Sequence, residues 1–341
     1  MRSAFAAAAA LFLAAPVLAA RAVADPVADF YAGKTVTLAV SGSAGGGYDT
    51  LGRAVARYLG RHMPGNPAVV VKNIPGAGGI LLMNQMYNTA PRDGTWLASA
   101  QNNTPFEPLY GTKEAEYDAR KVIYIGSPSA EVALLAVMSS TGARNIADAR
   151  AKPLNMGSSG RNSTPSFYAR LANETLGTKL NIIVGYPGQN DALLAMERGE
   201  IDGYPSAFYN SLMSTRPTWI AEGKVNLLAQ FGAAKEAAIA DTPWATELAR
   251  NAEDRALIEA ASAPLGVGRP YVMPPGVPAD RVAAMRRAFL DAMDDPEFQA
   301  DNRRAQLGAN KPQSAEELMA GVEKAYAAPP AVIERLRKLL Q

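Results

Sequence analysis

A glycine-rich stretch, SGSAGGGYDT at residues 41–50, is the first place in the chain where residue types and spacing could do chemistry. It follows the apolar run TVTLAV and precedes an amphipathic pattern, so the sequence predicts a loop between a strand and a helix. Glycine lets the backbone approach a ligand closely, and a helix N-terminus offers unpaired N–H groups. Such a loop could bind a dinucleotide, a nucleoside triphosphate or a small anion.

The two nucleotide alternatives lack their companion residues. A GxAxxG spacing begins at Gly42, but the next predicted strand ends in Lys72 and Asn73, where a dinucleotide site needs an acid. A phosphate-binding P-loop continues with Lys and Ser or Thr, whereas this loop continues with Tyr and Asp at 48–49. Capture of a small anion by backbone amides is the interpretation that remains. Similar loops recur at 75–79, 158–164 and 185–190.

Enzymatic chemistry has one candidate motif, GSSG at 157–160. Its register differs from the GxSxG of serine hydrolases, and a serine nucleophile usually needs a base. His62 is the only histidine and falls in the last turn of a predicted helix, which favours a structural role. A secreted serine hydrolase using Ser158 or Ser159 is kept as an alternative function. With one histidine, no cysteine and no clustered carboxylates, we expect no metal site, and we expect no cofactor.

The order of predicted elements positions these loops. Strands at 35–40, 68–72 and 95–100 alternate with helices that begin near Asp49 and Ile80. Strands joined in this way are parallel, so the loops 41–48, 73–79 and 101–104 should share the carboxyl edge of one sheet. The same order recurs from 132 to about 205, which predicts a second α/β sheet with its own polar edge.

The rest of the chain predicts the domain organisation. A Pro- and Gly-rich stretch at 263–278 leads into helices from about 279 to 340. A terminal region of helices alone must pack on an existing sheet, most simply that of the first domain. We therefore expect domain 1 to comprise residues 25–126 and 264–341 and domain 2 residues 127–263. The chain would cross between them near Ser127 and again near Pro264.

The N-terminus predicts export. Arg2 precedes an apolar run at 4–20 and small residues at 22–24, which is typical of a signal peptide spanning residues 1–24. No cysteine is available for lipid attachment, so we expect a soluble periplasmic product cleaved near Ala24. Cleavage would remove Arg2 and Arg21 and lower the net charge from +2 to zero, which argues against nucleic acid as a partner.

At this point several segments, in order from about residue 29 to the end, resemble the Bug family. They are FYAGKTVTLAVSGSAGGGYDTLGRAVARYL, VVVKNIPGAGGILLMNQMYNTAPRDGTWLA, LNMGSSG, GYPGQNDALLAMERGEIDG and PPGVPADRVAAMRRAFLDAMDDPEF. The pair of GGGxD and PGAGG is the most specific part of the match. Bug proteins, also called TctC-like, are the substrate-binding proteins of tripartite tricarboxylate transporters.

The resemblance implies a type II periplasmic-binding-protein fold, a monomer with two α/β domains, a ligand cleft between them and C-terminal helices packed on the first domain. It also implies that main-chain amides and ordered water at the glycine loops hold a small organic carboxylate, which is delivered to integral-membrane permease subunits. A ligand sensor that docks on a membrane receptor would use the same fold and is kept as an alternative. The ligand-binding positions carried over are Gly45, Gly46, Gly47, Tyr48, Asp49, Ala77, Gly78, Gly79, Ser158, Ser159, Gly160, Thr164, Tyr186, Pro187 and Gly188.

Charged residues near these positions have separate expectations. Arg161 stands where the family commonly has a small residue, and it could bind a second carboxylate of the ligand. We expect Arg269 to form an interdomain salt bridge and Asp49 to shape its loop, through Arg53 one turn on. The residues do not distinguish aliphatic di- and tricarboxylates, aromatic acids and amino acids as ligands.

Overall fold

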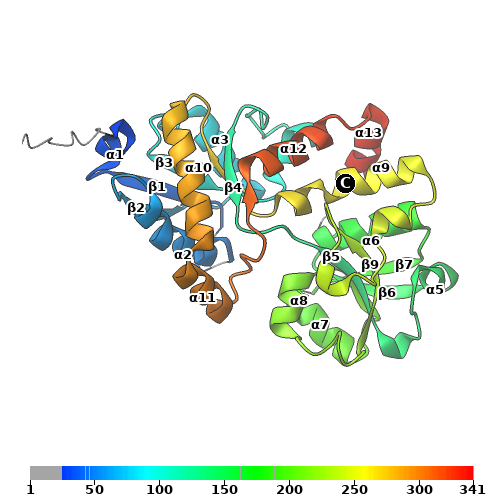
Figure 1. Cartoon of the computed structure of the whole chain (residues 1–341). Coiled ribbons are helices and arrows are strands. Elements are labelled where there is room, and N and C mark those ends of the chain that lie inside the picture. The colour runs from blue at the N-terminus through cyan, green and yellow to red at the C-terminus, as the bar shows by residue number, and fades with distance from the viewer. Residues whose placement is uncertain (1–24, 43, 46, 162, 187–188, 341) are drawn as a thin grey trace, which may run out of the picture.

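Two β-sheets lie side by side in a computed structural model that describes residues 25–340 except 43, 46, 162 and 187–188 (Figure 1). The predicted signal peptide lies outside the described residues. Within the described part of the chain, no helix is both long enough and apolar enough to cross a membrane.

The first sheet has the strand order β11-β4-β10-β3-β1-β2. β1 pairs in parallel with β2 and β3, as predicted, whereas β10 runs antiparallel to β3 and β4. The carboxyl ends of β1, β2 and β3 therefore lie at one edge. The strands are β1 (Thr35–Val40), β2 (Ala68–Asn73), β3 (Trp96–Ser99), β4 (Ile123–Ser127), β10 (Tyr271–Met273) and β11 (Gln313–Ser314).

Successive residues of β1 point to opposite sides of this sheet. Both sides therefore carry apolar side chains, and helices cover both. Leu38 packs with α2 and α10 in one apolar cluster, and Ala39 packs with α3 and α12 in another. The helices on this side of the molecule are α1 (Pro26–Tyr31), α2 (Gly47–His62), α3 (Ile80–Asn88), α4 (Glu107–Tyr110), α10 (Ala279–Asp294), α11 (Pro296–Ala305) and α12 (Ala315–Tyr326).

The second sheet has the order β7-β6-β8-β5-β9. β6 is parallel to β7 and β8, so the loops that follow these three strands share one edge, while β5 runs antiparallel to β8 and β9. Its strands are β5 (Ala133–Met138), β6 (Leu154–Ser158), β7 (Leu180–Val184), β8 (Gly203–Phe208) and β9 (Val225–Phe231). Its helices are α5 (Ile146–Ala151), α6 (Thr164–Leu176), α7 (Gln189–Glu197), α8 (Tyr209–Thr215) and α9 (Ala252–Val267).

The chain passes between the sheets at residues 128–132 and again at 268–270. α9 continues through Pro264 to Val267, so the second passage follows the proline by a few residues. The two crossing segments touch: the Ser127 hydroxyl donates to the Ser129 carbonyl at 2.8 Å and accepts from the Arg269 amide at 2.9 Å. Gly268 has φ +64°, and a Cβ added there would overlap the Ser129 carbonyl oxygen.

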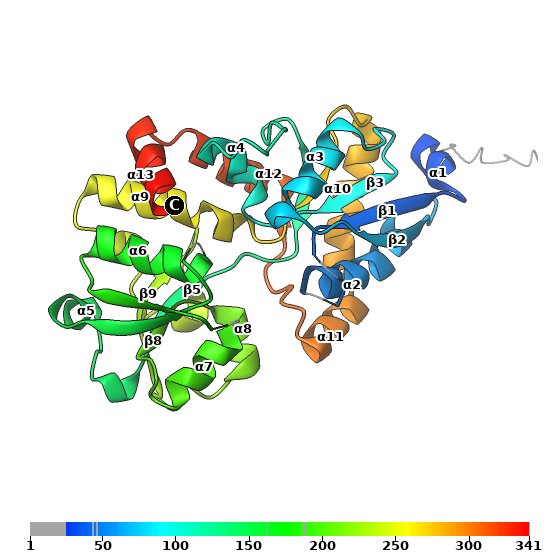
Figure 2. The same ribbon diagram turned by 180° about the vertical axis from the view of Figure 1, so that it is seen from behind.

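The last helix departs from the expected packing. α10, α11 and α12 pack on the first sheet as predicted, but α13 (Pro330–Leu340) buries Val332, Leu336 and Leu339 in the core of the second sheet. The placement follows from an amphipathic face that meets α6 and α9 (Figure 2). The expectation that all terminal helices pack on the first domain is wrong for α13.

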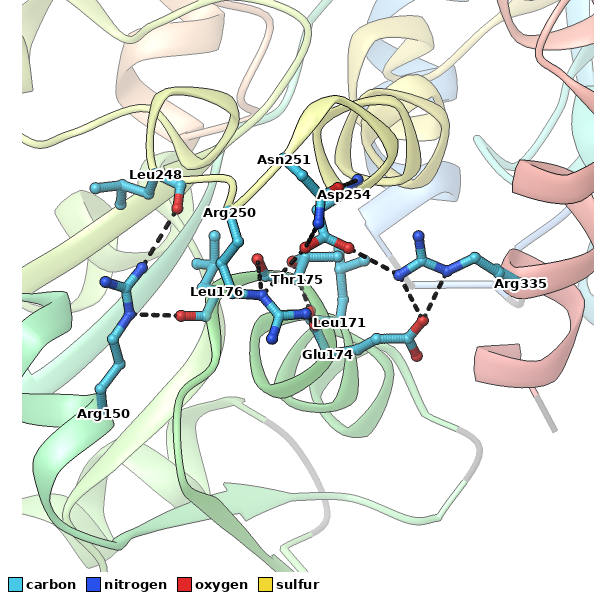
Figure 3. Close-up of polar contacts among 10 residues, drawn as sticks. All are labelled: Arg150, Leu171, Glu174, Thr175, Leu176, Leu248, Arg250, Asn251, Asp254 and Arg335. Carbon is cyan, nitrogen blue, oxygen red and sulfur yellow. Dashed lines mark hydrogen bonds and ion pairs between the residues drawn. The ribbon is translucent and has the colours of Figure 1, made fainter.

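A buried carboxylate anchors α13. Asp254, with 2% of its surface exposed, accepts from Arg335 of α13 at 2.8 Å and from Arg250 and Asn251 at 3.1 Å each (Figure 3). The same Arg335 guanidinium donates to Glu174 of α6 at 2.9 Å. One arginine therefore ties α13 to both α6 and α9.

Gly268→Ala tests the contact between the crossing segments. Gly223 has the same φ of +64° but open space where a Cβ would lie, so Gly223→Ala is a control that adds a Cβ at positive φ without a steric overlap. We expect the control to lose about 1–2 kcal/mol of unfolding free energy and Gly268→Ala about 3 kcal/mol or more. Denaturant unfolding measures both values, and equal losses would contradict a tight contact at Ser129.

Candidate functional site

A cleft of about 730 Å³ lies between the two sheets, and we call it the central cleft. From the side of the first sheet it is lined by Tyr48 and by residues 101–103, which follow β3. From the side of the second sheet it is lined by Ser163, Thr164, Phe208 and Ser211. The crossing segments contribute Glu131, Gly268 and Arg269, so the cleft reaches the junction between the sheets.

The glycine loop at 41–49 already holds a carboxylate of its own. Asp49 accepts a hydrogen bond from the Gly45 amide at 2.8 Å, one from Arg53 at 3.0 Å and one from Asn73 at 2.9 Å. The Arg53 guanidinium and the Gly45 amide hold the pKa of this carboxyl at about 2, although burial opposes them. The Gly45 amide is therefore engaged by Asp49, and the expected contact of Asp49 with Arg53 is present.

The helix that the sequence predicts to begin near Asp49, with Asp49 as its N-cap, begins slightly earlier in the structure. α2 begins at Gly47, so Asp49 lies inside the first turn and not at the N-cap. Its carboxylate reaches back to a preceding amide, which satisfies a donor that the helix leaves unpaired. Gly46 lies outside the described residues.

Tyr48 brings the glycine loop into the central cleft. Its hydroxyl accepts from the Asn102 amide at 3.3 Å, and its ring lies 5.3 Å from the Arg269 guanidinium. Burial raises the pKa of Tyr48, so its hydroxyl stays neutral and available as a donor. Of the positions predicted in this loop that the structure describes, Tyr48 is the one that lines the cleft.

The second glycine loop supports the cleft from outside. Ala77, Gly78 and Gly79 form a 3-10 turn (Ala77–Gly79) in which all three residues have positive φ. The Gly78 carbonyl accepts from the Asn103 side chain at 3.5 Å, and a Cβ on Gly79 would lie 3.0 Å from Thr104. This turn packs against the loop after β3 and lines neither the central cleft nor the cavity described below.

The serines of GSSG have different environments. Ser158 is buried, and its hydroxyl contacts those of Ser163 and Ser166 at 2.8 and 2.7 Å. The Gly160 carbonyl accepts from all three of these hydroxyls. Ser158 is thus part of the loop structure, whereas Ser159 is exposed and lines a second cavity.

This second cavity, of about 720 Å³, lies at the carboxyl edge of the second sheet and shares Ser163, Thr164, Phe208 and Ser211 with the central cleft. Gln189 also lines it; the Gln189 side-chain oxygen accepts from the Phe208 amide at 3.2 Å, while its buried nitrogen has no partner among the described residues. The Tyr186 amide donates to the Ser158 backbone carbonyl at 3.2 Å. Pro187 and Gly188 lie outside the described residues.

Arg161 is exposed and lines neither cavity. Its carbonyl accepts from Arg170 at 2.7 Å, and the same guanidinium donates to the Leu339 carbonyl of α13 at 2.6 and 3.0 Å. The backbone at Arg161 is therefore tied to α13 through Arg170.

An ion pair joins the two crossing segments inside the central cleft. The guanidinium of Arg269 lies 3.9 Å from the Glu131 carboxylate and donates to the Leu307 carbonyl at 3.4 Å. Burial raises the pKa of Glu131, and the charge of Arg269 acts in the opposite direction. The salt bridge expected for Arg269 is thus present, with Glu131 as its partner.

Some residues of the cleft have no counterpart among the predicted positions: Gln101, Asn102, Asn103, Glu131, Phe208, Arg337 and Leu340. Residues 101–103 follow a predicted strand at the correct edge, so their position alone was a usable signal. Glu131, Arg337 and Leu340 reach the cleft through the path of the chain between the sheets and through α13, which local patterns do not encode.

His62 has the structural role that its position in the sequence favours. It ends α2, and its Nε2 lies 2.9 Å from a carboxylate oxygen of Asp295, the residue that caps α11. His62 lowers the pKa of Asp295. The contact lies on the side of the first sheet, and neither residue lines a cavity described above.

Comparisons with known proteins agree with the family that the sequence resembles. The family model described as "Tripartite tricarboxylate transporter family receptor" matches residues 52–334. The UPF0065 protein in the gbd 5' region of Cupriavidus necator is 28% identical over 284 residues, which are 80% of this chain and 78% of that protein.

Solved structures are similar to this chain in fold. A TctC solute binding protein from Polaromonas, with no ligand, has a TM-score of 0.70 at 20% identity over 89% of this chain and 98% of that chain. An R. palustris protein with adipate has a TM-score of 0.57 at 19% identity over 90% of this chain and 97% of that chain. The predicted fold class, a two-domain α/β periplasmic-binding-protein fold, is confirmed.

Asp49→Asn tests the internal carboxylate of the glycine loop. The folded pKa of about 2 lies below the ordinary 3.8, so the charged form stabilises the fold above about pH 4, and this contribution disappears as the pH falls through 2. We expect Asp49→Asn to lose about 2 kcal/mol of unfolding free energy at pH 7. The difference from wild type should shrink as the pH falls below 4.

Denaturant unfolding at pH 7, 5 and 3 measures this pH dependence. Asp29→Asn, at an exposed acid in the first turn of α1, is the control and should change stability by less than about 0.5 kcal/mol. A loss for Asp49→Asn that is the same at every pH would assign Asp49 a role that does not depend on its charge.

Proposed function

Because the chain belongs to the tripartite tricarboxylate transporter receptor family, we propose that it captures a small organic carboxylate in the periplasm and delivers it to integral-membrane permease subunits. The central cleft is the observation that carries this proposal. Its volume of about 730 Å³ suits a small molecule, and it opens where strands of both sheets end, the usual ligand position in α/β folds.

The chain is a binding protein and not an enzyme, as the receptor family to which it belongs indicates. The environment of Ser158 agrees with this conclusion. Its hydroxyl contacts two other serine hydroxyls and a carbonyl, and none of these groups can act as the general base that a serine nucleophile needs. This environment argues against a hydrolase that uses Ser158 as its nucleophile.

The ligand contacts that we propose come from both sheets. Tyr48 and the Asn102 side chain would bind from the first sheet, Ser159 and Thr164 from the second, and Arg269 from the crossing segment. The first turn of α2, beginning at Gly47, adds amides at a helix N-terminus. Ala77, Gly78 and Gly79 would act indirectly by supporting residues 101–104.

The domains that we propose are residues 25–126 with 264–341, and residues 127–263, with residues 1–24 as a signal peptide removed on export. α13 belongs to the first domain by sequence but packs on the second, so it bridges the two. Ligand would close the cleft by rotation about the crossing segments at 128–132 and 268–270. Export and delivery to a permease agree with the family; a sensor on a membrane receptor would use the same closure.

Ligand binding can be tested on residues 25–341 with a panel of mono-, di- and tricarboxylates that includes adipate. We expect at least one to raise the melting temperature, because ligand at 100 times its dissociation constant adds about 2.7 kcal/mol of stability. Thr164→Val should weaken that ligand about tenfold or more, since it removes a hydroxyl donor to a charged group. Thr50→Val, at an exposed threonine of α2, is the control. The absence of any shift across the panel would contradict the proposed function.

Closure of the central cleft on ligand binding can be measured separately. Small-angle scattering of residues 25–341 should give a smaller radius of gyration with saturating ligand than without it, because the two sheets rotate toward each other around the cleft. An unchanged profile with a ligand that binds by calorimetry would show that binding occurs without closure.

A further inference from the structure

The charged side chains that line the central cleft balance one another. Two arginines, Arg269 and Arg337, face two acids, Glu107 and Glu131, in the described part of the wall. Each of these four charges therefore needs a partner, either in the wall of the cleft or in the ligand.

Glu107 and Arg337 have structural partners. The Glu107 carboxylate accepts from the Asn103 side chain at 2.7 Å and from the Thr112 hydroxyl at 2.5 Å. Arg337 donates to the Leu109 carbonyl at 2.9 Å. The contacts of Glu107 hold the residues on either side of α4, and that of Arg337 joins α13 to α4, so both side chains take part in the structure of the wall.

Arg269 and Glu131 are held more loosely. Within the described residues, the polar contacts of the Arg269 guanidinium are the Leu307 carbonyl at 3.4 Å and the Glu131 carboxylate at 3.9 Å. The guanidinium has five donors in a planar fork, so most of them are unused. Glu131 has Arg269 as its ion-pair partner and has 12% of its side chain exposed. Two complementary charges thus lie in the cleft with unfilled hydrogen-bonding capacity.

A ligand with a carboxylate alone would satisfy Arg269 but would place its negative charge beside Glu131. A ligand with an ammonium group on the carbon next to its carboxylate would satisfy both side chains. The four charges would then alternate in sign around a ring, in which each charge has neighbours of opposite sign. Burial raises the cost of leaving Glu131 charged without such a partner.

We propose that the Arg269–Glu131 pair makes this protein a receptor for zwitterionic ligands of the α-amino acid class, with Arg269 on the carboxylate and Glu131 on the ammonium group. This inference rests on the proposed function and narrows the ligand that the central cleft takes. Glu131 is the specificity-determining residue. The aromatic rings of Tyr48 and Phe208 would contact the remainder of the ligand.

The test uses pairs of probes that differ in the amino group alone: aspartate and succinate, 2-aminoadipate and adipate, leucine and 4-methylpentanoate. Calorimetry on residues 25–341 should show that the amino acid of at least one pair binds wild type more tightly than its partner. Glu131→Gln should weaken that amino acid about tenfold or more, because a buried charge-assisted contact is lost, and should strengthen the matching acid. A merely structural role of Glu131 would not change the affinities for the amino acid and the matching acid in opposite directions.

Three variants complete the design. Glu131→Asp keeps the charge and should keep the preference for the amino acid, which also guards against a Glu131→Gln chain that fails to fold. Arg269→Lys should weaken both members of a pair, because both carry the carboxylate. Glu316→Gln removes an acid from the surface ion pair with Arg286 and should change neither.

The outcomes separate the two levels of the proposal. If the acids bind as tightly as the amino acids, or if Glu131→Gln changes both in the same direction, the zwitterion inference is wrong and the proposed function stands. If none of the probes and no other carboxylate binds, the proposed function fails and the inference fails with it.

Discussion

The contact between the two crossing segments is the constraint on which the rest of the molecule depends. Gly268 has no room for a side chain beside the Ser129 carbonyl, and the Ser127 hydroxyl bonds both segments. Because the segments touch, the two sheets are held together at this junction, and the central cleft reaches it. Arg269 and Glu131 lie in these same segments, so the junction supplies both the geometry of the cleft and the charges at its base.

A second link between the sheets runs through α13. Arg335 joins this helix to the buried Asp254, while Arg170 binds the carbonyls of both Leu339 and Arg161. The wall of the cleft and the loop after β6 are therefore held by one set of guanidinium contacts. Asp254, which is buried and paired with three side chains, favours one arrangement of these helices, whereas apolar packing alone would tolerate several.

Local patterns predict the parts of the fold that depend on neighbouring residues. The apolar runs at β1, β2 and β3 and the glycines between them gave the parallel order of the first sheet, and the approach of Asp49 to Arg53 follows from helical spacing. The sequence predicts a passage between domains near Pro264, whereas α9 continues through this proline to Val267. Proline usually ends or kinks a helix, so local patterns do not indicate this continuation. The position of α13 depends on a distant partner, Asp254, that no local pattern indicates.

The candidate site also contains residues that sequence order predicts and residues that it does not. Tyr48 and Thr164 line the central cleft because each lies in the first turn of a helix that follows a strand and its loop, which sequence order can show. Ser158 was expected at the ligand but is buried within its own loop, because three hydroxyls converge on the Gly160 carbonyl. Glu131 could not be predicted, since it reaches Arg269 because two passages of the chain, distant in sequence, touch each other between the sheets.

The even balance of charge on the wall of the central cleft also has a kinetic consequence. Two acids and two arginines close together produce little field beyond the Debye length of about 8 Å at physiological ionic strength. Residues 25–341 carry equal numbers of acidic and basic side chains, so the molecule as a whole adds no long-range attraction. Long-range electrostatic steering would then contribute little to the association rate, and this rate would depend little on salt concentration.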